Sequence, residues 1–377
     1  MTNSLFKKSN VNSIVIALLL CANPITWVLQ FSNVIVVIII AALLIAMFNN
    51  GIMFLFDTKK ILLSLSMILF LCVSMLIEPK NEYVVLYFYE FLVFGIPALF
   101  ISSLKFSKKA LYYSIALLSF VMLPFISSID FGNSAFDKVD YGFWMGISYG
   151  LLRFILPLLL CVFFIKRLAI RFLLVLVSLF YIFTLLKYGS RGTLLSIVFF
   201  LVVFYFINRG LSLRQGLKFV FIGTFLLIGL QIYLTANSDT FFFLRKTESL
   251  GGGGDLSNGR GQLFSKAIDG IIEKPFYGNG IGAFEYLHGT YPHNFLLHMS
   301  YEGGIFYSMF FLLILLTCIY NCFKGKVSKE NLIYLLLLFS ISIMELLFSS
   351  IYWRSQVFWL FIGFVISKKY LNNESSD

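Results

Sequence analysis

Long blocks of apolar residues recur along the whole chain, and short polar segments separate them. A block of about 20 apolar residues is long enough to cross the hydrocarbon core of a bilayer as an α-helix. Of the 377 residues, 59% are hydrophobic and only 12% are charged, whereas soluble domains are about a quarter charged. The pattern predicts an all-α, polytopic membrane helix bundle rather than a soluble domain with one anchor.

The blocks predict about 12 transmembrane helices with both the N and the C terminus in the cytoplasm. With this orientation most of the 29 Lys and Arg residues fall in inner segments, such as KRLAIR (166–171) and NRGLSLRQGLK (208–218). This is the asymmetry that the positive-inside rule describes, so the net charge of +11 reflects membrane topology and predicts no nucleic-acid partner. The predicted spans are 11–29, 33–48, 61–77, 83–102, 110–126, 142–164, 172–186, 193–208, 219–235, 294–320, 332–352 and 356–367.

The order of the blocks divides the chain into three segments. Residues 1–235 hold helices 1–9, residues 236–293 form one large outer loop, and residues 294–377 hold helices 10–12 and a short cytoplasmic tail. A loop of this length is usually functional. Ser257 or Asn258 can cap a helix inside it, Pro275 can end that helix, and its apolar residues recur with helical spacing: Leu263, Phe264, Ala267, Ile268, Ile271 and Ile272. We expect this amphipathic helix to lie at the membrane interface.

All three histidines lie in the stretch HGTYPHNFLLHMS, where the long loop enters the tenth span. Imidazole can transfer protons near neutral pH, and His293 is the strongest candidate; helix capping or a place among lipid headgroups is the alternative. The spacing of His288, His293 and His298 fits no zinc motif. We therefore predict no metal site and no cofactor. The irregular acids of the third outer loop, Asp130, Asp137 and Asp140, favour a solvated turn over metal-dependent transfer.

The cysteines all lie inside apolar blocks, which predicts packing residues rather than a disulfide framework: Cys21, Cys72, Cys161, Cys318 and Cys322.

Several cations stand within or just outside apolar blocks, on the predicted outer side. Such residues are usually functional or paired, because charge is costly in a bilayer. Guanidinium groups bind phosphate oxygens at two points, so converging arginines suit a diphosphate. The group consists of Arg153, Lys187, Arg191, Arg260 and Arg354.

Two alternatives remain open for these cations. Lys187 and Arg191, in the turn LLKYGSRGTLL (185–195), can also extend to lipid headgroups. Arg153 can also form a structural ion pair inside the bundle, with Glu90 or Glu345 as its partner.

Three stretches together resemble the O-antigen polymerase and O-antigen ligase superfamily of polytopic undecaprenyl-diphosphate-glycan transferases. They are the outer turn GSRGTLL (189–195), the helix GRGQLFSKAIDGIIEKPFYGNGIGAF (259–284) and the entry PHNFLLHMSYEGGIFYSMFF (292–311). The resemblance covers roughly residues 185–320, with Arg354 as a weaker extension.

The resemblance implies a multi-pass protein of the bacterial inner membrane whose large loop and active site face the periplasm. Its implied catalytic residues are Arg191 and Arg260, which would hold the diphosphate, and His293, which would position or deprotonate the acceptor hydroxyl. Asn294 and Glu302 would support the histidine end of the site. The remaining cations, Lys187, Arg153 and Arg354, would contribute to substrate binding.

The implied activity is transfer of undecaprenyl-diphosphate-linked glycan to a hydroxyl of a lipid-linked repeat unit, as in an O-antigen polymerase. Arginines can stabilise the leaving diphosphate, so we expect metal-independent transfer, and direct displacement would invert the anomeric configuration. The expected partners are the undecaprenyl-diphosphate-linked oligosaccharide, the bilayer and a polysaccharide chain-length regulator. The alternatives are an O-antigen ligase that uses lipid A-core as acceptor and, in another class, a lipid-linked oligosaccharide transporter or flippase.

Overall fold

The structure is a computed structural model that describes residues 7–29, 33–78, 80–128, 141–188, 191–209 and 260–371. Every regular element in these ranges is helical. Within them, eight helices are long and apolar enough to cross a membrane, and three shorter helices are also apolar. The all-α expectation is confirmed for the described residues, whereas the twelve spans, their orientation and the periplasmic loop stay predictions. The predicted ninth span (219–235), the predicted caps Ser257 and Asn258, and the third-loop acids lie outside these ranges.

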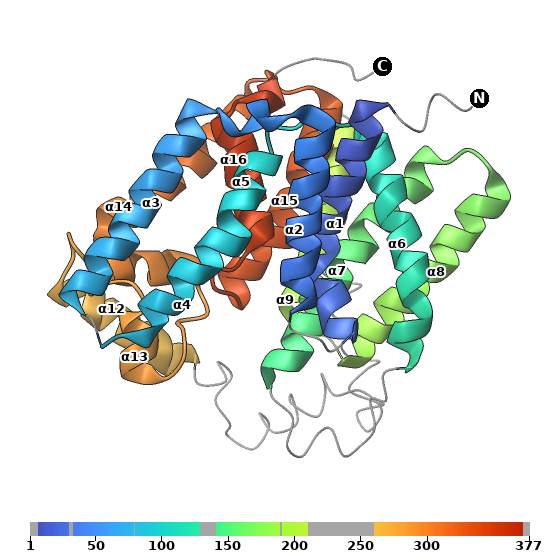
Figure 1. The fold of residues 1–377 in the computed structure, drawn as a ribbon. Helices are drawn as coiled ribbons and strands as arrows, with labels where there is room; N and C mark the ends of the chain where they lie inside the picture. Colours follow the sequence, from blue (N-terminus) through green and yellow to red (C-terminus); the bar gives the residue numbers. More distant parts are fainter. Residues whose placement is uncertain are drawn as a thin grey trace, which may run out of the picture. The chain divides into compact units, whose positions relative to one another are not determined.

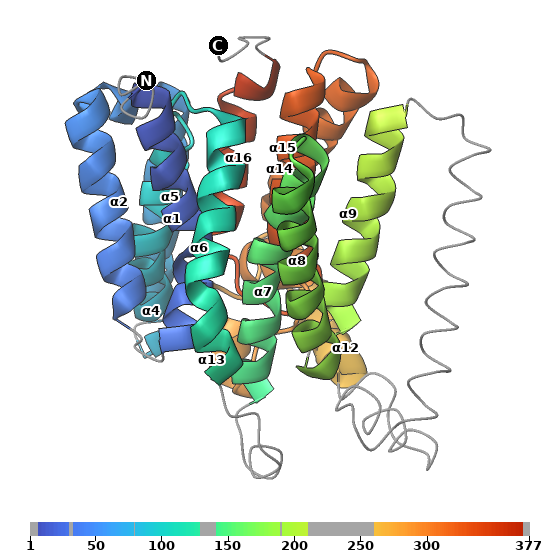
Figure 2. The same ribbon diagram turned by 90° about the vertical axis from the view of Figure 1, so that its right-hand side faces the viewer.

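The described helices form two compact units. Unit 1 is built around α7, which packs against four other helices, and Figure 2 shows α6, α7 and α8 side by side. Residues 339–344 of α15 also belong to this unit. The helices that lie wholly in this unit are α1 (Lys8–Leu29), α6 (Lys108–Ser128), α7 (Tyr141–Phe164), α8 (Leu168–Tyr188) and α9 (Arg191–Arg209).

Unit 2 holds most of α2 and the elements from η1 to α5 and from α12 onward. Helix α16 packs against α5, α3 and α14, and Figure 1 shows α12 and α13 near the end of α4. The elements are α2 (Val34–Asn50), η1 (Ile52–Leu55), α3 (Thr58–Ile77), α4 (Glu82–Glu90), η2 (Phe91–Gly95), α5 (Ile96–Ile101), α12 (Arg260–Glu273), α13 (Ala283–His288), α14 (Phe295–Phe323), α15 (Lys329–Phe348), α16 (Gln356–Ile366) and η5 (Lys369–Leu371).

The amphipathic helix predicted inside the long loop is present as α12. Its apolar residues divide into two rows. Leu263, Ala267 and Ile271 pack in a small core that also contains Phe284 and Tyr301, whereas Ile268 and Ile272 are exposed. The inner row attaches α12 to α14, and the outer row remains on the surface of unit 2.

Helix α14 is broken at Gly304, a feature that the sequence pattern does not predict. Gly304 has φ of 76° and ψ of −179°, which no helical residue adopts. The segment after α12 supplies the hydrogen bonds that the helix loses at this break. The N–H of Ile305 donates to Pro275 O at 2.8 Å, and the N–H of Asn279 donates to Tyr301 O at 2.7 Å. The break therefore joins the end of α12 to the middle of α14.

We predict that Gly304→Ala destabilises the protein far more than Gly325→Ala does. Both glycines have positive φ, but a Cβ at Gly304 would collide with the carbonyl oxygen of Phe276, whereas a Cβ at Gly325 would meet nothing. Backbone strain costs about 1 kcal/mol or more at both positions, and it is larger at Gly304, whose ψ of −179° lies in a region that essentially only glycine adopts. The collision should add roughly 1 to 3 kcal/mol at Gly304. Thermal unfolding of the two variants in detergent measures the difference. Equal melting temperatures would contradict the close packing at the break.

Candidate functional site

The first turn of α14 is preceded by two of the residues that the sequence singles out. Asn294 is the N-cap: its side-chain oxygen accepts the N–H of Leu296 at 3.1 Å and of Leu297 at 3.2 Å. His293, just before it, has φ of 56°, a left-handed conformation that is unusual for a residue other than glycine. Residues held in this conformation are found preferentially at functional sites. The N-cap fixes the backbone next to His293, whereas the support of the histidine and contact with a substrate stay predictions.

His293 lies in an environment that keeps its imidazole neutral. Its Nδ1 is buried and has no hydrogen-bond partner among the described residues, and its ring lies 4.2 Å from the ring of Tyr291, centroid to centroid. Burial and, second, the positive charge of Arg260 lower the pKa of His293 to about 4. The ring is therefore free to accept a proton at neutral pH. The structure brings together two of the three predicted catalytic residues, both in unit 2.

Glu302 is a fully buried carboxylate on α14 whose contacts come from several elements. One oxygen accepts the backbone N–H of Gly282 at 2.8 Å. The other accepts the indole N–H of Trp353 at 3.2 Å and the hydroxyl of Tyr352. These donors are all protein groups, so the carboxylate fixes the segment before α13 and the turn before α16 relative to α14. Its support of the histidine end of the site stays a prediction. Direct contact between Glu302 and a substrate stays a prediction.

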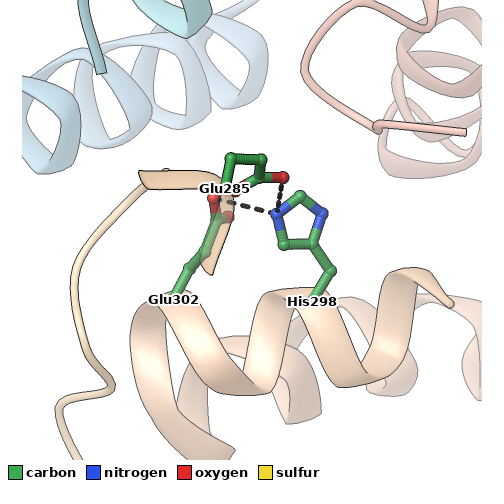
Figure 3. Close-up of side chains that lie close together, drawn as sticks. All are labelled: Glu285, His298 and Glu302. Atoms are coloured by element: carbon green, nitrogen blue, oxygen red, sulfur yellow. Dashed lines mark ion pairs between the residues drawn. The ribbon is translucent and has the colours of Figure 1, made fainter. Parts of the chain in front are cut away.

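Two further residues meet Glu302 inside unit 2: His298, which the sequence ranks below His293, and Glu285, which the sequence does not single out. The Nε2 atom of His298 lies 2.9 Å from an oxygen of Glu285 and 3.2 Å from an oxygen of Glu302, as Figure 3 shows. All three side chains are at most 3% exposed. The i, i+4 spacing of His298 and Glu302 was a signal available in the sequence, but nothing in the sequence connects Glu285 to them.

Arg354 lies in the turn between α15 and α16, directly after Tyr352 and Trp353, and it is exposed. Its guanidinium lies near the carboxylate of Glu90, a buried residue of α4. Arg354 thus belongs to the same unit as Arg260 and His293, in a turn that contacts Glu302. Its binding of a substrate stays a prediction.

Arg153, Lys187 and Arg191 belong to unit 1. Arg153 is buried in α7, and its Nη1 donates to the backbone oxygen of Leu20 at 3.3 Å. Lys187 lies in the last turn of α8, and Arg191 begins α9, so two helices flank the predicted outer turn. The side chains of Lys187 and Arg191 lie outside the described part of the structure, and the substrate contacts of all three cations stay predictions.

Residues 173–312 match the O-antigen ligase family. The match contains the predicted outer turn, α12 and the histidine segment, and it confirms the resemblance to the O-antigen ligase and polymerase superfamily. Together with the apolar helices, it supports a multi-pass membrane protein. No curated protein matches the chain at a significant level.

The environment of His293 leads to a prediction about its titration. The pKa of His293 in the folded protein is about 4, below the ordinary value of about 6.5. The contribution of His293 to the free energy of unfolding is therefore fully present above about pH 6.5 and is lost as the pH falls toward 4. Removing the guanidinium in Arg260→Gln should raise the pKa of His293, while burial should still keep it below 6.5. Histidine-labelled NMR can follow this titration, because the chain has only three histidines.

Lys266→Gln is the matched control. Burial and, second, the charge of Lys266 lower the pKa of His288, so this variant should raise the pKa of His288 and leave His293 unchanged. If Arg260→Gln leaves the His293 titration unaltered, Arg260 does not lie close enough to act with it.

Proposed function

We propose that the chain is a glycosyltransferase that moves undecaprenyl-diphosphate-linked glycan to the hydroxyl of a lipid-linked repeat unit on the periplasmic face, as an O-antigen polymerase. The observation that supports this best is the neutral imidazole of His293 beside the guanidinium of Arg260, inside the stretch that matches the O-antigen ligase family. The pair combines a proton acceptor with a cation for a diphosphate, which are the two groups that such a transfer needs.

In this reaction the acceptor oxygen attacks the anomeric carbon, and the bond from that carbon to the diphosphate oxygen breaks. His293 accepts the proton of the acceptor hydroxyl, and a general base of this kind contributes roughly a 10²- to 10⁴-fold acceleration. Arg191 and Arg260 stabilise the charge that develops on the departing undecaprenyl diphosphate. Because the arginines supply positive charge at the diphosphate, no metal is required there. Attack from the side opposite the leaving group inverts the anomeric carbon.

A second candidate differs only in its acceptor. The matched family is described as O-antigen ligase, which favours transfer to lipid A-core rather than to a growing repeat unit. Both candidates use the same donor and the same three residues. The choice between them depends on which acceptor hydroxyl reaches His293.

We expect Arg191→Ala, Arg260→Ala and His293→Ala each to lower the rate of transfer by about 10²- to 10³-fold, the typical effect of removing one preorganised donor. The assay uses the purified chain in liposomes with an undecaprenyl-diphosphate-linked repeat unit, and products are separated as a ladder on a gel. Lys326→Ala is the control, since Lys326 is an exposed cation in the loop between α14 and α15, and it should retain wild-type activity.

The acceptor decides between the candidates. A ladder from the repeat unit alone identifies a polymerase, whereas a product that forms only with added lipid A-core identifies a ligase. If neither acceptor gives a product and the lipid-linked glycan instead crosses the bilayer, the chain is a transporter and the proposed reaction is wrong.

A further inference from the structure

The cluster of Glu285, His298 and Glu302 has the arrangement of ligands around an ion. One atom from each side chain lies within 4.8 Å of the others. The two carboxylate oxygens lie 2.9 Å and 3.2 Å from Nε2 of His298. Bonds from a metal to such atoms are about 2.0 to 2.2 Å long, so neighbouring ligand atoms around one ion lie about 3 Å apart. The separations in the cluster already agree with that spacing.

The contacts in the cluster are short ion pairs between buried groups. Nε2 of His298 and both carboxylate oxygens of Glu285 are buried and have no hydrogen-bond partner among the described residues. Figure 3 shows one ring nitrogen beside an oxygen of each carboxylate, and three such groups are placed to share an ion.

The charge of the cluster also favours a cation. Two carboxylates and one imidazole are enclosed together, each side chain being at most 3% exposed. A third buried carboxylate, Glu90, lies near Glu285 and has the guanidinium of Arg354 beside it. Buried charges are stable only when they are paired or coordinate metals, and the imidazole can balance only one of the carboxylates. A divalent ion would balance two.

The surroundings of Glu302 fix its orientation toward the cluster. Its remaining contacts, with the N–H of Gly282, the hydroxyl of Tyr352 and the indole of Trp353, come from outside the three residues. Ligating carboxylates are commonly held by such outer hydrogen bonds.

We propose that Glu285, His298 and Glu302 form a binding site for one divalent transition-metal ion, Zn²⁺ or Mn²⁺. Imidazole with carboxylates suits these ions. The ion joins α13 to α14 and so holds the segment between α12 and α14 in place. Its role is structural: the proposal does not rest on the proposed function and assigns no metal to the diphosphate.

The test uses the full chain without a polyhistidine tag, purified in detergent and treated with EDTA. Elemental analysis before EDTA should find about one divalent ion per chain. Adding back Zn²⁺ or Mn²⁺ should raise the melting temperature by several degrees, and Glu285→Gln and His298→Gln should each reduce ion binding at least tenfold. X-ray absorption of the loaded protein should show one imidazole among nitrogen and oxygen ligands.

His288→Gln and Glu273→Gln are matched controls, since these residues lie in the same region outside the cluster, and both variants should bind the ion as wild type does. The proposal is overturned if the wild-type chain contains no ion and neither ion raises its melting temperature, or if Glu285→Gln and His298→Gln fold and bind as wild type does. The cluster would then be a metal-free ion pair. None of these measurements depends on transfer activity, so the proposal and the proposed function fail independently.

Discussion

The buried carboxylate of Glu302 is the interaction on which the candidate site in unit 2 depends. A charged group without access to solvent must have several partners, and these come from three places: the segment before α13, the turn before α16 and His298 on the same helix. The contacts with the carboxylate hold each of these partners in one position. The backbone around Gly282 and the aromatic turn at Trp353 are thereby fixed relative to α14.

The break in α14 at Gly304 also leaves polar groups that need partners from another part of the chain. A helix that loses its own hydrogen bonds must find other partners, and the chain between Pro275 and Gly280 supplies them. The end of α12 is thus bonded to the middle of α14, and Leu263, Ala267 and Ile271 pack the rest of α12 against Phe284 and Tyr301. Arg260 at the start of α12 and His293 just before α14 are consequently near each other, although 32 positions separate them in the sequence.

The electrostatics of the two histidines differ for a physical reason. His293 faces a cation and is partly buried, which favours a neutral ring that can accept a proton. His298 faces two carboxylates, which favours a ring that pairs with charge or binds an ion. The stretch HGTYPHNFLLHMS thus places close together in sequence two histidines whose surroundings differ in charge. The cation beside His293 suits that ring to accepting a proton, whereas the carboxylates beside His298 suit it to pairing with charge or binding an ion.

The sequence alone determined the helical class, most helix positions and the amphipathic helix α12, because the period and length of apolar runs depend on local chain geometry and on the thickness of a bilayer. It also selected His293 and Arg260, through a residue pattern shared with a family. Only tertiary structure decided that Glu285 joins His298 and Glu302, that α14 breaks at Gly304, and that one row of α12 is buried while Ile268 and Ile272 are exposed. These features depend on contacts between elements distant in the chain, and hydrophobic periodicity carries no information about which polar groups such contacts enclose.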